Sequence, residues 1–355
     1  ASMIHNEMRK HGIKLVLGYT VEGFKEKDNG VEVLLKDNPS LQADMVVLAI
    51  GVTPDTALAK EAGLELGIKG SIVVNDRMET SVPDIYAAGD AVQVKHYVTG
   101  DDALISLAGP ANKQGRIIAD NICGGDSRYL GSQGSSVIKV FDMTAATTGI
   151  NETNAKKSGL DVDTVILSPM SHAGYYPGGK VMTMKVVFEK ETYRLLGAQI
   201  IGYEGVDKRI DVLATAIHAG LKATQLKDLD LAYAPPYSSA KDPVNMAGFM
   251  IDNIAKGTLK QWHLEDMDKI SKDKSVVLLD VRTVGEFNRG HMDGFRNIPV
   301  DELRERINEI EKGKPVYLIC QSGLRSYIAS RILEGNGYET YNFSGGFRFY
   351  DAVVN

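Results

Sequence analysis

The sequence predicts a multidomain protein of mixed α/β and α+β class. Its 355 residues correspond to two or three domains of ordinary size. Near the carboxyl end, an apolar run at 316–319 stops at Cys320 and gives way to a Gly-containing loop and a helical pattern at 327–333, which is typical of an α/β crossover. Residues 181–188 and 195–201 instead alternate like strands of an antiparallel sheet.

Composition and charge exclude several classes of protein. The formal net charge is −6 and the pI is near 5.7, so we expect neither a nucleic-acid partner nor an anionic membrane partner. No window approaches the ~18–20 apolar residues of a membrane span. Two cysteines far apart do not form a disulfide framework and fit a reducing cytoplasm, and no signal peptide or metal site is expected.

The amino-terminal part is expected to be the remainder of a nucleotide-binding domain. An amphipathic helix pattern ends at Gly12, and strands are expected at 14–18, 31–35 and 45–50, with a hairpin-type turn at 28–30. A doubly wound nucleotide domain also needs a first strand and a Gly-rich phosphate turn, and no Gly-x-Gly-x-x-Gly occurs in this chain.

A ligand-binding pattern follows this part. A strand at 85–88 is predicted to deliver Gly89 and Asp90 at its carboxyl end, where open α/β sheets bind ligands. Glycine permits close backbone approach, and the carboxylate can accept from ligand hydroxyls; the alternative is a plain turn. A helix is predicted over 107–122, with a proline in its first turn, and Cys123 is expected to be a packing residue at its end.

Residues 46–54 and 80–90 together resemble the second flavin-binding motif of the pyridine nucleotide-disulfide oxidoreductases. The resemblance implies that Asp90 holds the ribityl chain of FAD, and that the helix at 107–122 aims its positive N-terminus at the isoalloxazine ring. The FAD-binding residues implied in this way are Gly89, Asp90, Pro110, Ala111 and Lys113.

A Gly/Ser-rich stretch at 131–136 marks a domain boundary. The strands beyond it, from 137–142 onward, and helix patterns at 207–219 and 246–254 resemble the dimerisation domain of the same superfamily, which implies a homodimer. Within this domain, residues 172–178 and 233–245 look like coenzyme A-disulfide reductases and their rhodanese-fused relatives.

That resemblance makes Tyr233 and Tyr237 candidate catalytic residues, with Tyr233 reaching across the dimer to the active-site sulfur of the other subunit. A phenol suits this role because it can donate a hydrogen bond to a leaving thiolate. The alternative is that this Tyr-Ala-Pro-Pro segment packs as a rigid turn.

Cys320 is the candidate nucleophile of the carboxyl-terminal part. Its thiol is placed at a helix entrance, where free N–H groups and the helix dipole stabilise a thiolate, and Arg325 adds positive charge to the same loop. The alternative is a small core cysteine that ends a strand.

Motifs around Cys320 resemble the rhodanese domain in order and spacing. They comprise Asp280 with Arg282, Glu286 with Phe287, Gly290 with His291, the Cys-x-x-Gly-x-Arg loop, and Gly345 with Gly346. We expect Asp280 and Arg282 to form a solvated ion pair and His291 to lie on the surface.

The resemblance implies that Cys320 carries sulfane sulfur as a persulfide. Four residues separate Cys320 from Arg325, whereas related phosphatases need five, so sulfur transfer ranks above phosphate hydrolysis. The amides expected to cradle the persulfide belong to Gln321, Ser322, Gly323, Leu324 and Ser326.

The predicted boundaries are 1–127 for the NAD/FAD-binding remainder, 131–254 for the dimerisation domain, 255–262 for a linker and 263–355 for the rhodanese domain. One hypothesis is that the chain is part of an NAD(P)H- and FAD-dependent reductase of CoA-disulfide, persulfide or polysulfide whose upstream segment is lacking. Its partners would then be coenzyme A, other thiols and small sulfur donors. The alternative is a stand-alone sulfurtransferase on a dimerisation scaffold with a vestigial flavin site.

Overall fold

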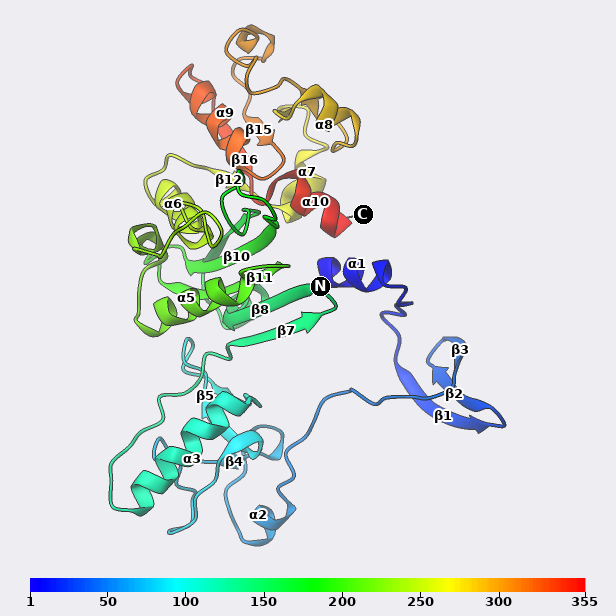
Figure 1. Cartoon of the computed structure of the whole chain (residues 1–355), viewed down its shortest axis with the longest axis vertical. Coiled ribbons are helices and arrows are strands. Elements are labelled where there is room, and N and C mark those ends of the chain that lie inside the picture. Colours follow the sequence, from blue (N-terminus) through cyan, green and yellow to red (C-terminus); the bar gives the residue numbers. More distant parts are fainter. Residues whose placement is uncertain (355) are drawn as a thin grey trace. The chain divides into compact units, whose positions relative to one another are not determined.

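The structure is a computed structural model that describes residues 1–354 (Figure 1). The chain divides into two compact units. One unit contains residues 1–4, 96–101 and the chain from Ser132 onward, and the other contains residues 5–95 and 102–131. Each unit is described separately below. The mixture of parallel and antiparallel sheets with helices agrees with the multidomain α/β and α+β class that the sequence predicts.

The unit of residues 5–95 and 102–131 contains two small three-stranded sheets. The first, β1-β2-β3, is an antiparallel meander, and the second has the order β4-β5-β6. Met78, Val92 and Val94 form a small buried core against one face of helix α3. The elements are α1 (Ser2–Lys10, which begins in the other unit), β1 (Val21–Lys27), β2 (Gly30–Leu35), β3 (Asn38–Ala43), α2 (Ala57–Glu61), η1 (Ile68–Gly70), β4 (Ile72–Val73), η2 (Gly89–Ala91), β5 (Val92–Lys95), β6 (Asp102–Ala103) and α3 (Ala108–Ile122).

Three expected strands of this unit are wrong. Residues 14–18, 45–50 and 85–88 form no strand, although the turn before Gly30 does close the β1–β2 hairpin. A strand needs a partner for its N–H and C=O groups, and the apolar run at 45–50 has none in the described part of the chain, so that Ile50 is 88% exposed. Cys123 is also exposed, which corrects the expectation that it packs inside.

The middle of the chain forms a five-stranded antiparallel sheet of order β7-β8-β11-β10-β9. Alternate residues of its central strands are buried against α5 and α6, where they form the largest core of the protein. The elements are β7 (Ser136–Val140), β8 (Met143–Gly149), α4 (Glu152–Lys157), β9 (Val162–Leu167), β10 (Met182–Glu189), β11 (Leu195–Gly202), α5 (Val206–His218), η3 (Ala223–Asp228) and α6 (Pro243–Ala255).

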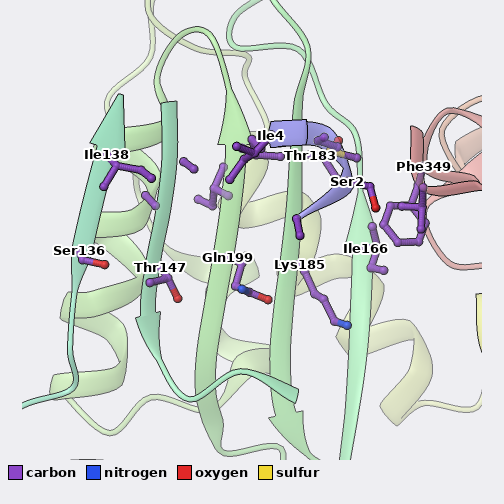
Figure 2. Close-up of a pocket in the computed structure, with 17 residues that line it drawn as sticks. Ser2, Ile4, Ser136, Ile138, Thr147, Ile166, Thr183, Lys185, Gln199 and Phe349 are labelled. Atoms are coloured by element: carbon purple, nitrogen blue, oxygen red, sulfur yellow. The ribbon is translucent and has the colours of Figure 1, made fainter. Parts of the chain in front are cut away.

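The opposite face of this sheet lines an open cavity of about 440 Å³. Figure 2 shows Thr147, Gln199 and Lys185 on neighbouring strands pointing to this side, with Ser2 and Phe349 at its edge. The lining is mixed in polarity and brings together none of the residues that the sequence predicts as a site.

The carboxyl-terminal part is a parallel sheet of order β12-β16-β15-β13-β14. Its central strands are almost wholly buried, as expected for parallel strands covered on both faces. The elements are β12 (Gln261–Trp262), η4 (Leu264–Asp266), α7 (Met267–Ile270), β13 (Val277–Asp280), α8 (Val284–Asn288), β14 (Arg296–Asn297), η5 (Ile307–Glu309), β15 (Val316–Ile319), α9 (Leu324–Glu334), β16 (Thr340–Phe343) and α10 (Gly346–Val354).

Buried polar contacts join this parallel sheet to the antiparallel sheet within the same unit. The Ser344 hydroxyl accepts from the backbone N–H of Ile166 at 3.0 Å, and the Gln261 amide donates to the Thr164 carbonyl at 2.8 Å. The linker before β12 therefore ends where these hydrogen bonds hold the parallel sheet against the antiparallel sheet. Across residues 1–354, no helix has the length and apolar character needed to cross a membrane.

Limited proteolysis should cut the chain first between Met45 and Val52. This run is apolar, exposed and outside any helix or strand, so a protease such as thermolysin can bind it in extended form. The control is strand β10, which also carries Met, Val and Phe residues but is paired on both edges and should survive. Earlier cleavage within β10 than within 45–52, read by mass spectrometry of the fragments, would contradict this assignment.

Candidate functional site

The site is built around Cys320, which lies at the carboxyl end of β15, directly before the loop that leads into α9. Its sulfur accepts two hydrogen bonds, from the Gly323 backbone N–H at 3.1 Å and from the Ser326 hydroxyl at 3.2 Å. Gly323 is the N-cap residue of α9 and has φ +97°, a conformation that favours glycine. The loop therefore turns the donors of a helix N-terminus onto the sulfur.

Cys320 is fully buried and also packs in the core of this domain, so the alternative of a core cysteine describes part of its environment. A purely apolar surrounding is nevertheless wrong, because two polar hydrogens point at the sulfur. The other predicted loop residues make no hydrogen bond to it: Gln321 and Ser322 are half-buried and Leu324 is exposed at the rim.

Two glycines let the next crossover press against this loop. Gly346, at the start of α10, has φ +68°, and a Cβ there would lie 2.7 Å from the backbone nitrogen of Ser322. The same contact allows the Phe347 N–H to donate to the Cys320 carbonyl at 2.8 Å and the Arg348 N–H to donate to the Gln321 carbonyl at 3.1 Å. Gly346 is therefore needed for close packing against the loop that holds Cys320, whereas a Cβ on Gly345 would lie 2.8 Å from that of Phe349 in α10.

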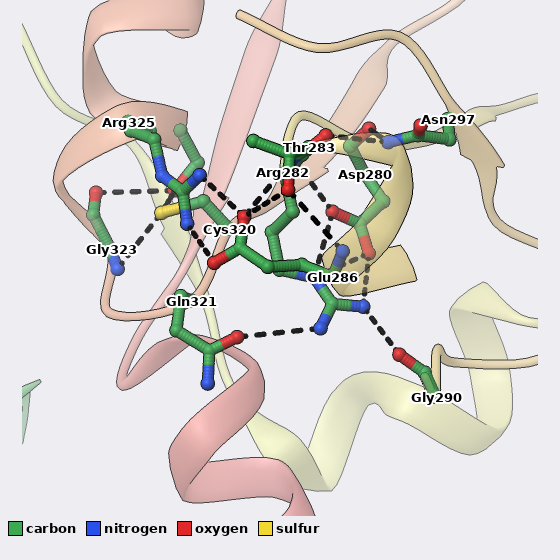
Figure 3. A network of polar contacts seen from close by, with 11 residues as sticks. Asp280, Arg282, Thr283, Glu286, Gly290, Asn297, Cys320, Gln321, Gly323 and Arg325 are labelled. Atoms are coloured by element: carbon green, nitrogen blue, oxygen red, sulfur yellow. Dashed lines mark hydrogen bonds and ion pairs between the residues drawn. The ribbon is translucent and has the colours of Figure 1, made fainter. Parts of the chain in front are cut away.

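Arg325 does not contribute a free positive charge to the loop. Its guanidinium binds both oxygens of Glu286 at 2.7 Å, as Figure 3 shows. Hydrogen bonding from Arg325 lowers the pKa of Glu286 to about 2, against the opposing effect of partial burial, and Thr283 adds to the lowering. Thr283 and Glu286 also form a capping box at the start of α8. Glu286 is thus a site residue that the sequence analysis placed only within a motif.

Asp280 and Arg282 are buried, which corrects the expectation of a solvated pair. Arg282 donates to Asp280 from Nε at 2.9 Å and from Nη2 at 2.7 Å, and to the Gly290 carbonyl at 2.8 Å. Its Nη1 donates to the Gln321 side-chain oxygen at 3.3 Å, and its guanidinium stacks 3.9 Å from the centre of the Phe347 ring. Arg282 therefore connects β13, the loop and α10 (Figure 3). His291 is exposed, as expected.

The candidate tyrosines lie in the antiparallel domain. The Tyr233 and Tyr175 hydroxyls are hydrogen-bonded at 2.8 Å, and this bond raises the pKa of Tyr233. Tyr237 is 72% exposed and takes no part in this hydrogen bond. Both predicted tyrosines line a cavity of about 530 Å³. Tyr175 lies within the 172–178 pattern, but the sequence does not predict it as a site residue, and only the fold places it beside Tyr233.

A buried arginine fixes the segment that carries these tyrosines. Arg209 binds the Asp242 carboxylate at 2.9 Å and donates to the backbone carbonyls of Ser171 and Tyr237 at 2.8 and 3.4 Å. Because Arg209 and Asp242 are both nearly inaccessible, each compensates the burial of the other. The expected Tyr-Ala-Pro-Pro turn is therefore anchored to α5 through Arg209.

The candidate flavin residues gather at the start of α3 in the other unit. Gly89 has φ +81°, and its N–H donates to the side-chain oxygen of the buried Gln114 at 2.7 Å. This bond holds the Gly89–Asp90 turn against the helix whose first turns contain Pro110, Ala111 and Lys113. Asp90 is exposed. Gln114 is a positioning residue that the sequence analysis missed.

These residues fit one end of a flavin site but not a whole one. The exposed Asp90 carboxylate beside the N-terminus of a fifteen-residue helix suits a polyol or an electron-rich ring. No Gly-rich phosphate turn is present in the sequence, and the apolar run at 45–50, which a nucleotide-binding sheet would bury, is exposed. The described residues therefore form only part of a flavin site.

Replacing Glu286 by Gln should lower the melting temperature of the carboxyl-terminal domain by a few degrees at pH 7. The charged contact, in which both Glu286 oxygens bind Arg325, is only partly exposed to solvent. It contributes about 1–2 kcal/mol to the free energy of unfolding. Because the folded pKa of about 2 lies below the ordinary 4.5, this contribution is present above pH 4.5 and is lost as the pH falls towards 2.

The control for this variant is Glu311→Gln, which removes an exposed carboxylate from the same domain. Calorimetric scans of both variants at several pH values give the comparison. The assignment predicts that the Glu286→Gln difference shrinks below pH 4.5, and a difference of equal size at pH 7 and pH 2 would contradict it.

Comparison with known families supports this organisation. Residues 1–115 match the pyridine nucleotide-disulphide oxidoreductase family, residues 135–243 match its dimerisation domain, and residues 263–352 match the rhodanese-like domain. The resemblances that the sequence predicts are thus confirmed.

Individual relatives agree with these matches. The chain is 38% identical over 242 residues to the CoA-dependent NAD(P)H sulfur oxidoreductase of Pyrococcus abyssi, covering 68% of this chain and 54% of that protein. It is 37% identical over 248 residues to coenzyme A disulfide reductase of Staphylococcus aureus, covering 69% and 55% respectively. The chain therefore spans about half the length of these relatives.

Two solved structures align over almost all of this chain. The reduced CoADR-RHD of Bacillus anthracis matches with a TM-score of 0.96 and 46% identity, covering 100% of this chain and 63% of that one. The NAD-dependent persulfide reductase of A. fulgidus matches with a TM-score of 0.90 and 40% identity, covering 99% and 64%. Along the chain, a match to the pyridine nucleotide-disulphide oxidoreductase family is therefore followed by a match to its dimerisation domain and by a rhodanese-like domain.

Proposed function

We propose that Cys320 carries sulfane sulfur as a persulfide. The observation that supports this most directly is the pair of donors aimed at its sulfur, the Gly323 N–H and the Ser326 hydroxyl. They stabilise the thiolate that attacks the sulfur donor, because its charge lies on the sulfur atom that they contact. The short loop between Cys320 and Arg325 supports sulfur as the group transferred.

The reaction is a displacement at sulfur. The Cys320 thiolate attacks the sulfane sulfur of a donor such as thiosulfate, a new S–S bond forms, and sulfite leaves with the electron pair of the old bond. An acceptor thiolate or cyanide then attacks the outer sulfur and restores the Cys320 thiolate. The step needs no external oxidant or reductant.

We further propose that the chain acts within an NAD(P)H- and FAD-dependent reductase of CoA-disulfide and persulfide, assembled as a homodimer. Similarity over the whole chain to CoADR-RHD, and to a persulfide reductase over 99% of it, favours this over a stand-alone sulfurtransferase. Purified chain that is colourless alone and turns yellow when FAD and the amino-terminal flavin segment of a full-length relative are supplied would support it, and a chain that never binds flavin in this mixture would support the alternative.

Cys320→Ser should abolish thiocyanate formation from thiosulfate and cyanide. The control is Cys123→Ser, which removes the only other cysteine, an exposed residue in the other unit, and should keep full activity. Ser326→Ala should retain activity but lower it about tenfold, because one charge-assisted hydrogen bond to the sulfur is lost. Activity that survives in Cys320→Ser would contradict the proposed function, and dephosphorylation of an aryl phosphate by the wild type would favour a phosphatase.

For Tyr233 we propose a separate role, as donor to the thiolate that leaves when a disulfide is reduced. Its bond to Tyr175 supports this, since it fixes the position of the Tyr233 hydroxyl and raises its pKa, which keeps the phenol protonated. In enzyme completed by the upstream flavin segment, Tyr233→Phe should slow CoA-disulfide reduction at least about tenfold. Thiosulfate:cyanide transfer should stay unchanged in the same preparation, and an equal loss of both activities would count against this role.

A further inference from the structure

A polar cavity of about 400 Å³ lies beside the Cys320 loop. It is enclosed by the end of the α8 segment, the residue after Cys320 and the first turns of α10. Its charged and polar lining residues are Arg282, Glu286, Arg289, Gln321, Arg348 and Asp351. The side chains of Arg289 and Arg348 have no part in the sequence motifs or in the proposed sulfur chemistry at Cys320.

The cavity has an excess of positive charge. Glu286 is already bound through both oxygens to Arg325, and Arg282 is matched by Asp280. Within residues 1–354, Arg289 and Arg348 take part in no salt bridge. Against these two guanidiniums stands the single carboxylate of Asp351. Arginine is suited to phosphate and carboxylate groups because its fork of N–H donors matches their oxygens.

Further donors point to the same cavity. The Gln321 side-chain oxygen accepts from Arg282, so its amide nitrogen faces away from that bond, and Figure 3 draws no contact to this nitrogen. Arg282 itself is almost inaccessible and uses Nη1 for only this one bond. An anion in the cavity would therefore meet an amide and buried guanidinium as well as the two unpaired arginines.

Backbone hydrogen bonds hold the cavity in a fixed position relative to the loop that contains Cys320. Gln321 follows Cys320 directly, and the backbone N–H groups of Phe347 and Arg348 bind the carbonyls of Cys320 and Gln321. A group held by Arg348 is thus positioned relative to the sulfur by two short backbone contacts. A cavity of this volume is larger than a lone oxyanion and within the range of small-molecule sites.

We propose that this cavity binds the anionic end of a thiol persulfide that exchanges sulfur with Cys320, through Arg289 and Arg348. The proposal rests on the proposed function of Cys320. The Cys320 thiolate attacks the outer sulfur of R–S–SH, and R–S⁻ leaves with the electron pair of the broken S–S bond. The recognised group is an oxyanion, either a phosphate, as on coenzyme A, or a carboxylate, as on glutathione.

The test compares sulfur loading of Cys320 in the full chain by three persulfides, those of coenzyme A, glutathione and the uncharged 2-mercaptoethanol. The variants are Arg289→Ala/Arg348→Ala and the control Arg304→Ala, which removes an exposed arginine elsewhere in the same domain. Loading is followed by mass spectrometry over a range of donor concentrations.

The double variant should lose at least about tenfold in kcat/KM for an anionic persulfide, mainly through KM, with the uncharged donor and Arg304→Ala unaffected. Loss confined to the coenzyme A persulfide identifies phosphate, and loss confined to the glutathione persulfide identifies carboxylate. Equal loss with the uncharged donor, or no loss with any donor, overturns the proposal while leaving Cys320 as the carrier. Failure of every donor to load wild-type Cys320 instead overturns the proposed function itself.

Discussion

The buried ion pair between Asp280 and Arg282 is the contact on which the geometry of the Cys320 site depends. Two charges removed from water are tolerated only when each is fully bonded, and Arg282 meets this condition with Asp280, Gly290, Gln321 and the face of Phe347. These partners come from four different segments of the domain. One guanidinium therefore sets the position of the strand end, the Cys320 loop and α10 together.

Next to that pair, the loop that holds Cys320 has no unbalanced charge close to the sulfur. Arg325 is neutralised by Glu286, so the sulfur depends on the Gly323 N–H and the Ser326 hydroxyl rather than on a bare guanidinium. Such dipolar stabilisation suits a carrier, because the sulfur must be held as an anion and yet released to the next acceptor. The excess positive charge lies in the neighbouring cavity, on Arg289 and Arg348, where it can bind an anionic sulfur donor.

The sequence predicts best those elements that depend on patterns within a short stretch of the chain. The crossover at Cys320, helix α3 and the strands of the antiparallel sheet follow from short-range patterns, and the structure places them within a few residues of the predictions. The burial of Asp280 and Arg282 could not be predicted in this way, because the partners of Arg282 lie up to 65 residues further along the chain. The same holds for Glu286 with Arg325 and for Tyr175 with Tyr233, which only tertiary folding brings together.

The wrong strand at 45–50 has a different cause. Its apolar pattern specifies a buried strand, but burial requires neighbouring strands, and the described residues supply none. The carboxyl-terminal domain, in contrast, contains every strand that its own site needs.

The most direct test of the central claim is the mass of the peptide that contains Cys320 after the intact chain has been treated with thiosulfate. The account predicts that this peptide gains the mass of one sulfur atom, that cyanide removes the added sulfur, and that the peptide containing Cys123 stays unchanged. A Cys320 peptide of unchanged mass, or added sulfur on Cys123 alone, would contradict it.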